Sequence, residues 1–230
     1  MSAVNYWLVI PAAGIGSRML SAIPKQYLDL CGESIINTSL KRLMSIPQLH
    51  TAVVALSAQD TWWNPPSSLN ILTTLGGNER FESVLNALHF LDDKAQPDDW
   101  VLVHDAVRPC VRRDKVMHLM ESLKEDDVGG ILAVPVNDTL KKAVDFRIQK
   151  TQNRANLWRA QTPQMFRYQR LKDSLQQTSQ RNIAITDEAS ALEQCGFSVK
   201  IIQGSEDNIK ITRPEDLALA TLFIQHQTNN

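Results

Sequence analysis

Small residues and two cations follow the first apolar run of the chain, which there reads Pro11-Ala12-Ala13-Gly14-Ile15-Gly16-Ser17-Arg18. Small side chains let backbone N–H groups approach phosphate oxygens closely. Arg18, with Lys25 a few residues later, adds fixed positive charge of the kind that holds a triphosphate. The spacing therefore favours a loop that binds nucleotide phosphates.

Two other phosphate-binding loops compete for this segment. The dinucleotide fingerprint G-x-G-x-x-G needs a small third residue, but Met19 stands there. An NAD-dependent oxidoreductase would also need an acidic residue after the second strand, where Ser57 follows Leu56. The P-loop pattern G-x-x-x-x-G-K-S/T is absent from the sequence. A non-catalytic nucleotide-binding protein remains open as an alternative to an enzyme.

The elements that position this loop alternate along the chain. Short apolar runs predict strands at about 6–10, 51–56, 71–75, 100–103 and 130–136, and period-3.6 patterns predict helices at about 34–44, 79–91 and 114–124. This alternation indicates an α/β fold, a three-layer α/β/α sandwich with a Rossmann-like, mixed and mostly parallel sheet. Ligands of such folds gather at the carboxyl ends of the strands. Segments 11–18, 76–80 and 105–108 follow three of those ends.

The alternation of predicted strands and helices stops after the fifth predicted strand. Residues 139–144 and 147–151 alternate around a possible turn at Asp145-Phe146, which predicts a β-arm at 137–160 inserted in a single domain spanning 1–230. The basic residues Lys141, Lys142 and Arg154 predict an anion contact there. Helices are expected near 168–177, 187–194 and 214–223, with a strand at 199–202.

Composition narrows the function classes. The net charge of −1 gives no global basic field, so neither nucleic acid nor a membrane is expected as a partner. Cys31, Cys110 and Cys195 are odd in number and far apart, which suits a reducing cytoplasm rather than a disulfide framework or zinc site. The N-terminus has no basic start and its apolar run is broken at Pro11, so no signal peptide or membrane span is expected.

Three further constellations receive structural interpretations. His104 and Asp105 are neighbours at a strand end, so their side chains point to opposite faces and His104 is expected to pack or hydrogen-bond. Asp187 and Glu188 are expected to open a helix capped by Thr186. Of Trp62 and Trp63, at least one indole is expected to pack on the core.

With these residues in view, the chain resembles the sugar-nucleotide nucleotidyltransferases, and within them the methylerythritol-phosphate cytidylyltransferases. The resemblance spans nearly the whole chain and is carried by seven pieces: 11–18, 24–27, 76–80 with 83–84, 103–109, 135–139, 186–190 and 207–214. Val107 and Asn78 depart from the residues usual in that family.

The resemblance implies roles for individual residues. It implies that the nucleotide is bound by Pro11, Ala12, Ala13, Gly14, Gly16, Gly77, Ser83, Asp105 and Ala106. It assigns the reacting phosphates to Arg18, Lys25 and Lys210, and a magnesium ion to Asp105. It assigns the methylerythritol phosphate to Arg108, Thr139, Arg154, Thr186 and Asp207, with Thr139 and Arg154 reaching the partner subunit of a homodimer.

The implied reaction transfers a cytidylyl group from CTP to 2-C-methyl-D-erythritol 4-phosphate and releases pyrophosphate, with Mg²⁺ as cofactor, in the non-mevalonate route to isoprenoid precursors. Its nucleophile is a phosphate monoester whose second pKa is about 6, so it is already ionised at neutral pH and cations matter more than a general base. A cytidylyltransferase for another polyol phosphate, such as ribitol 5-phosphate, is the alternative. It would differ mainly around Thr139 and Arg154.

Overall fold

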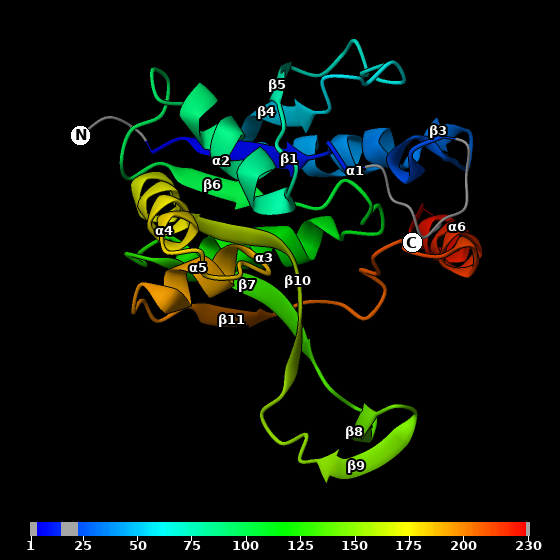
Figure 1. The fold of residues 1–230 in the computed structure, drawn as a ribbon. Coiled ribbons are helices and arrows are strands. Elements are labelled where there is room, and N and C mark those ends of the chain that lie inside the picture. The colour runs from blue at the N-terminus through cyan, green and yellow to red at the C-terminus, as the bar shows by residue number, and fades with distance from the viewer. Residues whose placement is uncertain (1–3, 15–22, 229–230) are drawn as a thin grey trace.

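A seven-stranded sheet forms the centre of the computed structural model, which describes residues 4–14 and 23–228 (Figure 1). The strand order is β11-β7-β10-β6-β1-β4-β5. Their bounds are β1 Tyr6–Pro11, β4 Leu49–Leu56, β5 Ile71–Leu75, β6 Trp100–Val103, β7 Gly129–Pro135, β10 Trp158–Arg167 and β11 Lys200–Gln203. The predicted site residues Gly16 and Arg18 lie outside the described residues.

All strand pairs in this sheet are parallel except those made by β10. It runs antiparallel to both β6 and β7, between which it lies. The carboxyl ends of β1, β4, β5, β6 and β7 therefore lie along the same edge of the sheet. The prediction of a mixed, mostly parallel sheet is confirmed.

Helices cover both faces of the sheet and make three layers. Residues of β1 alternate between them, because Leu8 and Ile10 join one core cluster and Val9 joins the other. The first cluster includes residues of α1 (Ile35–Met44) and α3 (Arg113–Leu123). The second includes residues of α2 (Arg80–Phe90), α4 (Tyr168–Gln180) and α5 (Glu188–Gln194). A third, smaller cluster contains Ala220 of α6 (Pro214–Thr228) together with Ile35 and Val107.

Strand β10 is the one sheet strand that the apolar pattern did not predict. Its middle residues Gln161, Thr162 and Gln164 are polar, and the Thr162-Pro163 peptide bond is cis. The pairing of β10 with β7 shifts register between Ala160 and Gln164. The three polar side chains are nevertheless buried, because each forms hydrogen bonds with loops beside the sheet.

The predicted hairpin is present as β8 (Leu140–Val144) and β9 (Arg147–Gln152), which pair antiparallel and project away from the sheet (Figure 1). Asp145 and Phe146 connect them with φ values of 48° and 59°, the signature of a two-residue type I′ turn. Every residue of both strands is exposed. A short hairpin of β2 (Asp29–Leu30) and β3 (Glu33–Ser34), after the 3-10 turn η2 (Lys25–Tyr27), was not predicted.

One predicted helix cap is wrong by a residue. Helix α5 begins at Glu188, and its N-cap is Asp187, not Thr186. The Asp187 carboxylate accepts a hydrogen bond from Ser190 N at 3.0 Å, while Ser190 Oγ accepts one from Asp187 N. Asp187 and Ser190 therefore form a reciprocal capping box, and Thr186 is left outside the helix.

The expectation about the two tryptophans is confirmed. Trp63 packs against the first core cluster, whereas Trp62 is exposed. All three cysteines are free thiols. Within the described ranges, no helix has the length and apolar character needed to cross a membrane.

The close approach of β7 to β10 gives a stability prediction. Gly129 has a φ of +133°, and a Cβ built there would lie 2.1 Å from Met165 O. We expect Gly129→Ala to lower the free energy of unfolding by about 3 kcal/mol, because overpacking adds to backbone strain. Gly196 is the matched control, since its φ is +84° but nothing lies within 4 Å of its Cβ position. Gly196→Ala should lose only about 1 kcal/mol. Equal losses in urea unfolding would contradict the argument.

Candidate active site

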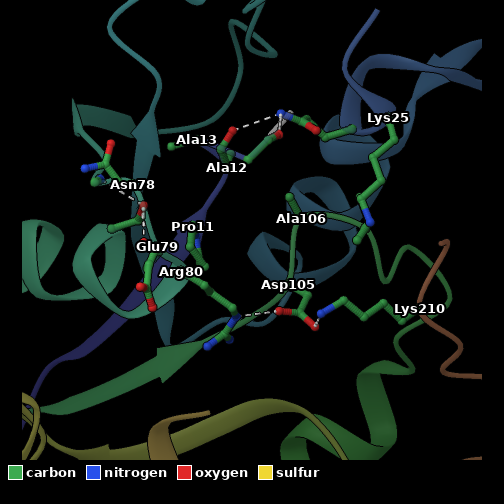
Figure 2. Close-up of a pocket in the computed structure, with 15 residues that line it drawn as sticks. Pro11, Ala12, Ala13, Lys25, Asn78, Glu79, Arg80, Asp105, Ala106 and Lys210 are labelled. Carbon is green, nitrogen blue, oxygen red and sulfur yellow. Dashed lines mark hydrogen bonds and ion pairs between the residues drawn. The ribbon is translucent and has the colours of Figure 1, made fainter. Parts of the chain in front are cut away.

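A cavity of about 280 Å³ opens where the carboxyl ends of β1 and β6 meet the start of α2 (Figure 2). Ten of the predicted site residues line it: Pro11, Ala12, Ala13, Gly14, Lys25, Gly77, Ser83, Asp105, Ala106 and Lys210. They come from segments that are far apart in the sequence. The convergence expected at the carboxyl ends of the strands is therefore present.

The loop after β1 is fixed from both sides. Ala12 N donates to Ala55 O on β4 at 2.8 Å. On the other side the buried Gln26 side chain donates to Ala12 O at 2.9 Å and to Gly14 O at 3.1 Å. Because Gln26 belongs to η2, the turn that carries Lys25 is tied to the glycine loop.

Lys25 connects this loop to a distant segment. Its Nζ donates to Ile211 O at 3.1 Å, across 186 residues of sequence. Ile211 follows Lys210, whose ammonium group also lies at the cavity. Two of the three cations predicted to hold phosphates are thus brought to one cavity, while the third, Arg18, is outside the described residues.

The opposite wall is the start of α2. Glu79 is its N-cap and forms a capping box with Glu82. Ser83 Oγ accepts a hydrogen bond from Gly77 N at 3.1 Å, so the loop before the helix is bound to its first turn. Gly77, Asn78 and Ser83 of this wall line the cavity.

A buried group of charges forms the floor of the cavity, and we call it the Asp105 charge cluster: Asp105, Arg80, Arg108, Glu188 and Lys210. Figure 2 shows Asp105 lying between Arg80 and Lys210. Arg80 Nε donates to Asp105 Oδ1 at 2.9 Å. Oδ2 pairs with Lys210 Nζ at 3.0 Å and with Arg108 Nε at 3.2 Å. Both carboxylate oxygens are therefore satisfied by cations.

The cluster fixes the protonation state of Asp105. Burial by itself raises the pKa of a carboxyl group, but Arg80, Lys210 and Arg108 outweigh it and hold the pKa of Asp105 far below its usual range. Burial in turn favours a lower pKa for Arg80, yet Glu188 and Asp105 raise it. Asp105 and Arg80 therefore stay charged at neutral pH.

His104 lies behind this floor and is fully buried. Its Nε2 lies 3.2 Å from Arg108 O, a group that only accepts, so Nε2 carries the proton. Its Nδ1 then accepts from Thr162 Oγ1 at 3.0 Å, and Thr162 Oγ1 accepts from Asp105 N at 3.1 Å. His104 therefore positions the backbone of Asp105, as the sequence interpretation of a hydrogen-bonded residue expected.

The other predicted residues that the structure describes lie outside the cavity. Arg108 contacts Asp105 from beneath and donates to Asn208 O at 2.7 Å. Thr186 lines an adjoining cavity of about 230 Å³ that shares Glu79 and Arg80 with the first. Asp207 faces elsewhere: its Oδ2 pairs with Arg112 at 2.6 Å and accepts from Gln227 at 2.7 Å, which anchors α6.

Thr139 and Arg154 belong to the arm, away from the cavity of the same chain. Both are exposed, and the Arg154 guanidinium donates to Asn137 O at the base of the arm. Within one chain the structure does not bring them to the other predicted site residues.

Five cavity residues were not assigned a role from the sequence: Gln26, Asn78, Glu79, Arg80 and Val107. Arg80 stood within a segment that the resemblance singled out, and the strand-end rule would have supported it. Glu188 also stood within such a segment, 186–190, but nothing in the sequence indicates its pairing with Arg80, which lies 108 residues earlier. A buried ion pair at that separation has no sequence pattern to reveal it.

Known proteins are similar to this chain over nearly its whole length. A family model described as IspD: 2-C-methyl-D-erythritol 4-phosphate cytidylyltransferase matches residues 6–226. A Hahella chejuensis protein named 2-C-methyl-D-erythritol 4-phosphate cytidylyltransferase is 45% identical over 229 residues, covering 98% of this chain and 95% of the relative. One of the same name from Pseudomonas aeruginosa strain UCBPP-PA14 is 48% identical over 217 residues, covering 92% and 93%.

Solved structures are similar as well. The crystal structure of the Francisella tularensis 2-C-methyl-D-erythritol 4-phosphate cytidylyltransferase superposes with a TM-score of 0.84 at 38% identity. The match covers 95% of this chain and 99% of that chain.

The burial of His104 gives a pH prediction. Burial lowers the pKa of His104 from 6.5 to about 4, so between these values the unfolded chain binds a proton there that the folded chain does not. Falling pH therefore favours unfolding, and the free energy of unfolding should drop by about 2 kcal/mol from His104 between pH 7 and pH 5. Asp105 adds little in this window, because its pKa is lowered and its contribution is lost only in more acidic solution.

Urea titrations of the wild type and His104→Asn at both pH values measure this difference. The variant should be less stable at pH 7 but lose less on acidification. A variant whose stability falls with pH as steeply as the wild type would show that His104 is not the group responsible.

Proposed function

Because this chain belongs to the 2-C-methyl-D-erythritol 4-phosphate cytidylyltransferase family, we propose that the cavity above the Asp105 charge cluster is the site of the family's reaction. The protein transfers CMP from CTP to 2-C-methyl-D-erythritol 4-phosphate, giving 4-diphosphocytidyl-2-C-methyl-D-erythritol and pyrophosphate. The ribitol phosphate alternative is not favoured, since the relatives share the methylerythritol name. One observation supports this location most: Lys25, Lys210 and Asp105 converge on the cavity from three distant segments.

The reaction is a displacement at phosphorus. A phosphate oxygen of the acceptor attacks the α-phosphorus of CTP, and the bond from that phosphorus to the bridging oxygen of the β-phosphate breaks. The electron pair leaves with pyrophosphate. The nucleophile is already ionised near neutral pH because its second pKa is about 6, so no side chain has to remove a proton. The barrier comes from repulsion between anions and from charge growing on the leaving group.

Fixed cations lower that barrier. We assign Lys25 and Lys210, with Arg18, to the reacting phosphates. Lys25 is held by a backbone carbonyl and Lys210 by Asp105, so their charges are already oriented before the nucleotide arrives. Such preorganisation favours the transition state, in which negative charge develops on the leaving group. The loop of Pro11, Ala12, Ala13 and Gly14 lines the cavity together with Gly77 and Ser83, and we assign it to the nucleotide.

We propose that a magnesium ion acts at the cavity, as the family resemblance implies. No group of three or more His, Cys, Asp or Glu side chains that could hold a metal occurs among the described residues. Asp105 is, however, a single ionised carboxylate at the cavity, and Mg²⁺ is commonly held by one carboxylate together with substrate phosphates and water. We propose that Asp105 supplies this ligand. The ion would neutralise charge on the triphosphate, while Lys25 and Lys210 orient it.

The arm is proposed to pair two copies of the chain. A two-stranded hairpin is marginally stable alone. Its apolar side chains Val144, Phe146 and Ile148 are at least half exposed and contact no core in the single chain. If a second copy covers them, Thr139 and Arg154 of the first chain lie at the cavity of the second chain. There Arg154 would hold the phosphate of the acceptor.

Three free cysteines support a reducing compartment, and we propose the cytoplasm.

Substitution of Lys25 tests the cavity assignment. With CTP and Mg²⁺, wild-type protein should release pyrophosphate with 2-C-methyl-D-erythritol 4-phosphate and not with ribitol 5-phosphate. Lys25→Ala should lower kcat on the order of 10²–10³-fold, by analogy with the loss of one transition-state donor. Lys124→Ala removes a surface cation paired with Glu121 and should leave kcat unchanged. Full activity of Lys25→Ala would rule out this cavity as the reaction site.

Mixing two inactive variants tests the shared site. If Arg154 serves the partner's cavity, a heterodimer of Lys25→Ala and Arg154→Ala has one site with neither defect. Random exchange of subunits should then restore about a quarter of wild-type activity. An activity no higher than the mean of the two separate variants would show that Arg154 acts within its own chain or that no exchange occurs. Labelled subunits, followed by native mass spectrometry, separate those two cases.

A further inference from the structure

An arginine at the cavity is held by a carboxylate that no substrate can reach. Arg80 is the first residue of α2, and Glu188 is the first residue of α5. Arg80 Nη1 and Nη2 donate to Glu188 Oε1 at 2.5 Å and Oε2 at 3.0 Å, a bidentate geometry. Glu188 is fully buried. The third guanidinium nitrogen, Nε, donates to Asp105 Oδ1 at 2.9 Å.

The protein scaffold holds Glu188 in place. Gln164, which is almost fully buried on β10, donates to Asp187 Oδ2 at 2.8 Å and accepts from Ala189 N at 2.9 Å. It therefore holds the residues on both sides of Glu188. The capping box of Asp187 and Ser190 closes the same turn. The position of the Glu188 carboxylate is set by the sheet and does not depend on a bound ligand.

The two carboxylate oxygens of Asp105 have different partners in this arrangement. Oδ1 is occupied by Arg80, whereas Oδ2 meets Lys210 and Arg108. Arg80 thus fixes the plane of the carboxylate, and Glu188 fixes the plane of the guanidinium. The two carboxylates and three cations of the cluster leave one net positive charge, at the side where Lys210 is partly exposed. Without Glu188, Arg80 would add a second.

We propose that Arg80 and Glu188 are positioning residues for the reaction: Glu188 orients Arg80, and Arg80 holds Asp105 so that Oδ2 faces Lys210 and the reacting phosphates. This inference rests on the proposed location of the reaction site. It assigns Arg80 a role distinct from that of Lys25 and Lys210. Its charge is balanced by Glu188, and three of its five N–H groups are already used within the protein.

The alternative is that Arg80 binds the nucleotide directly, since it also lines the cavity. The two roles predict different kinetics. Loss of a direct ligand weakens CTP binding, whereas loss of a positioning residue lowers kcat with binding preserved. Substitution of Glu188 distinguishes the two roles, because Glu188 is buried and can affect the reaction only through Arg80.

The experiment compares Glu188→Gln, Arg80→Lys and the double variant by steady-state kinetics and by calorimetric titration with CTP. Glu188→Gln keeps the size of the side chain but removes the charge. We expect each single change to lower kcat about 10–100-fold, as substitutions behind a catalytic group do. The KM and Kd for CTP should change less than about threefold, with full binding stoichiometry. The double variant should lose no more than the worse single one, because the two residues act as a unit.

Arg167→Lys is the matched control. Arg167 is another arginine with several partners, stacked on Trp100 and donating to Asp98 O and Asp126 O, at the amino end of β6. Its substitution should lower Tm and leave kcat unchanged. If Glu188→Gln does not fold, Glu188→Asp, which keeps the charge but shortens the side chain, is measured in the same way.

Several outcomes would overturn the inference: a wild-type kcat in Glu188→Gln, a loss of activity that only follows the fraction of protein able to bind CTP, or losses that multiply in the double variant. Lys25→Ala, measured in parallel, identifies the step that fails. If Lys25→Ala is inactive while Glu188→Gln is fully active, the positioning role is wrong and the site stands. If both are fully active, the location of the site is wrong.

Discussion

The burial of one carboxylate organises this molecule. Asp105 sits at the carboxyl end of the central strand β6 with 6% of its surface exposed, and an ionised group in that position is stable only if counter-charges and hydrogen bonds surround it. Its partners come from α2, from the turn after β6 and from the segment before α6. Helices and loops that no sheet pairing connects are therefore held together around this carboxylate. The same arrangement leaves cationic groups at the mouth of a cavity, so the constraint on folding and the chemistry of phosphate transfer coincide.

Strand β10 supports this centre by being irregular. A regular strand in the middle of a sheet presents apolar side chains to both layers, but β10 presents Thr162 and Gln164, which reach Asp105 and the start of α5. Asn208 Nδ2 donates to Thr162 O at 2.8 Å, which ties the segment preceding Lys210 to the same strand. The shift in register with β7 places these polar groups where the loops need partners. The polar residues of β10 thereby give several loops one shared support.

The sequence is informative where structure follows from local pattern. Apolar runs located six of the seven sheet strands, and the small residues after β1 with the cations beyond them located the cavity. Local sequence pattern did not predict the features that depend on contacts between residues far apart in the chain. Strand β10 was not predicted because its buried middle residues are polar. Neither Glu188 nor Gln26 has a local sequence feature that distinguishes a buried hydrogen-bonding residue from an exposed one. Thr186 looked like a helix cap because both it and Asp187 suit that position, and only the reciprocal bonds with Ser190 decide between them. Asp207 lies in a motif near Lys210, yet its carboxylate faces α6.

The direction of β10 has a consequence for how such proteins can diverge. Because β10 runs opposite to β7, the chain leaves the sheet and re-enters it at the same edge, the one on which the carboxyl ends of β1, β5 and β6 lie (Figure 1). Whatever is inserted at 136–157 starts and finishes on the ligand side without disturbing a strand pair. The cavity and this insertion can thus vary independently of each other. A protein that keeps the same nucleotide cavity can therefore act on a different acceptor when only the inserted segment is replaced.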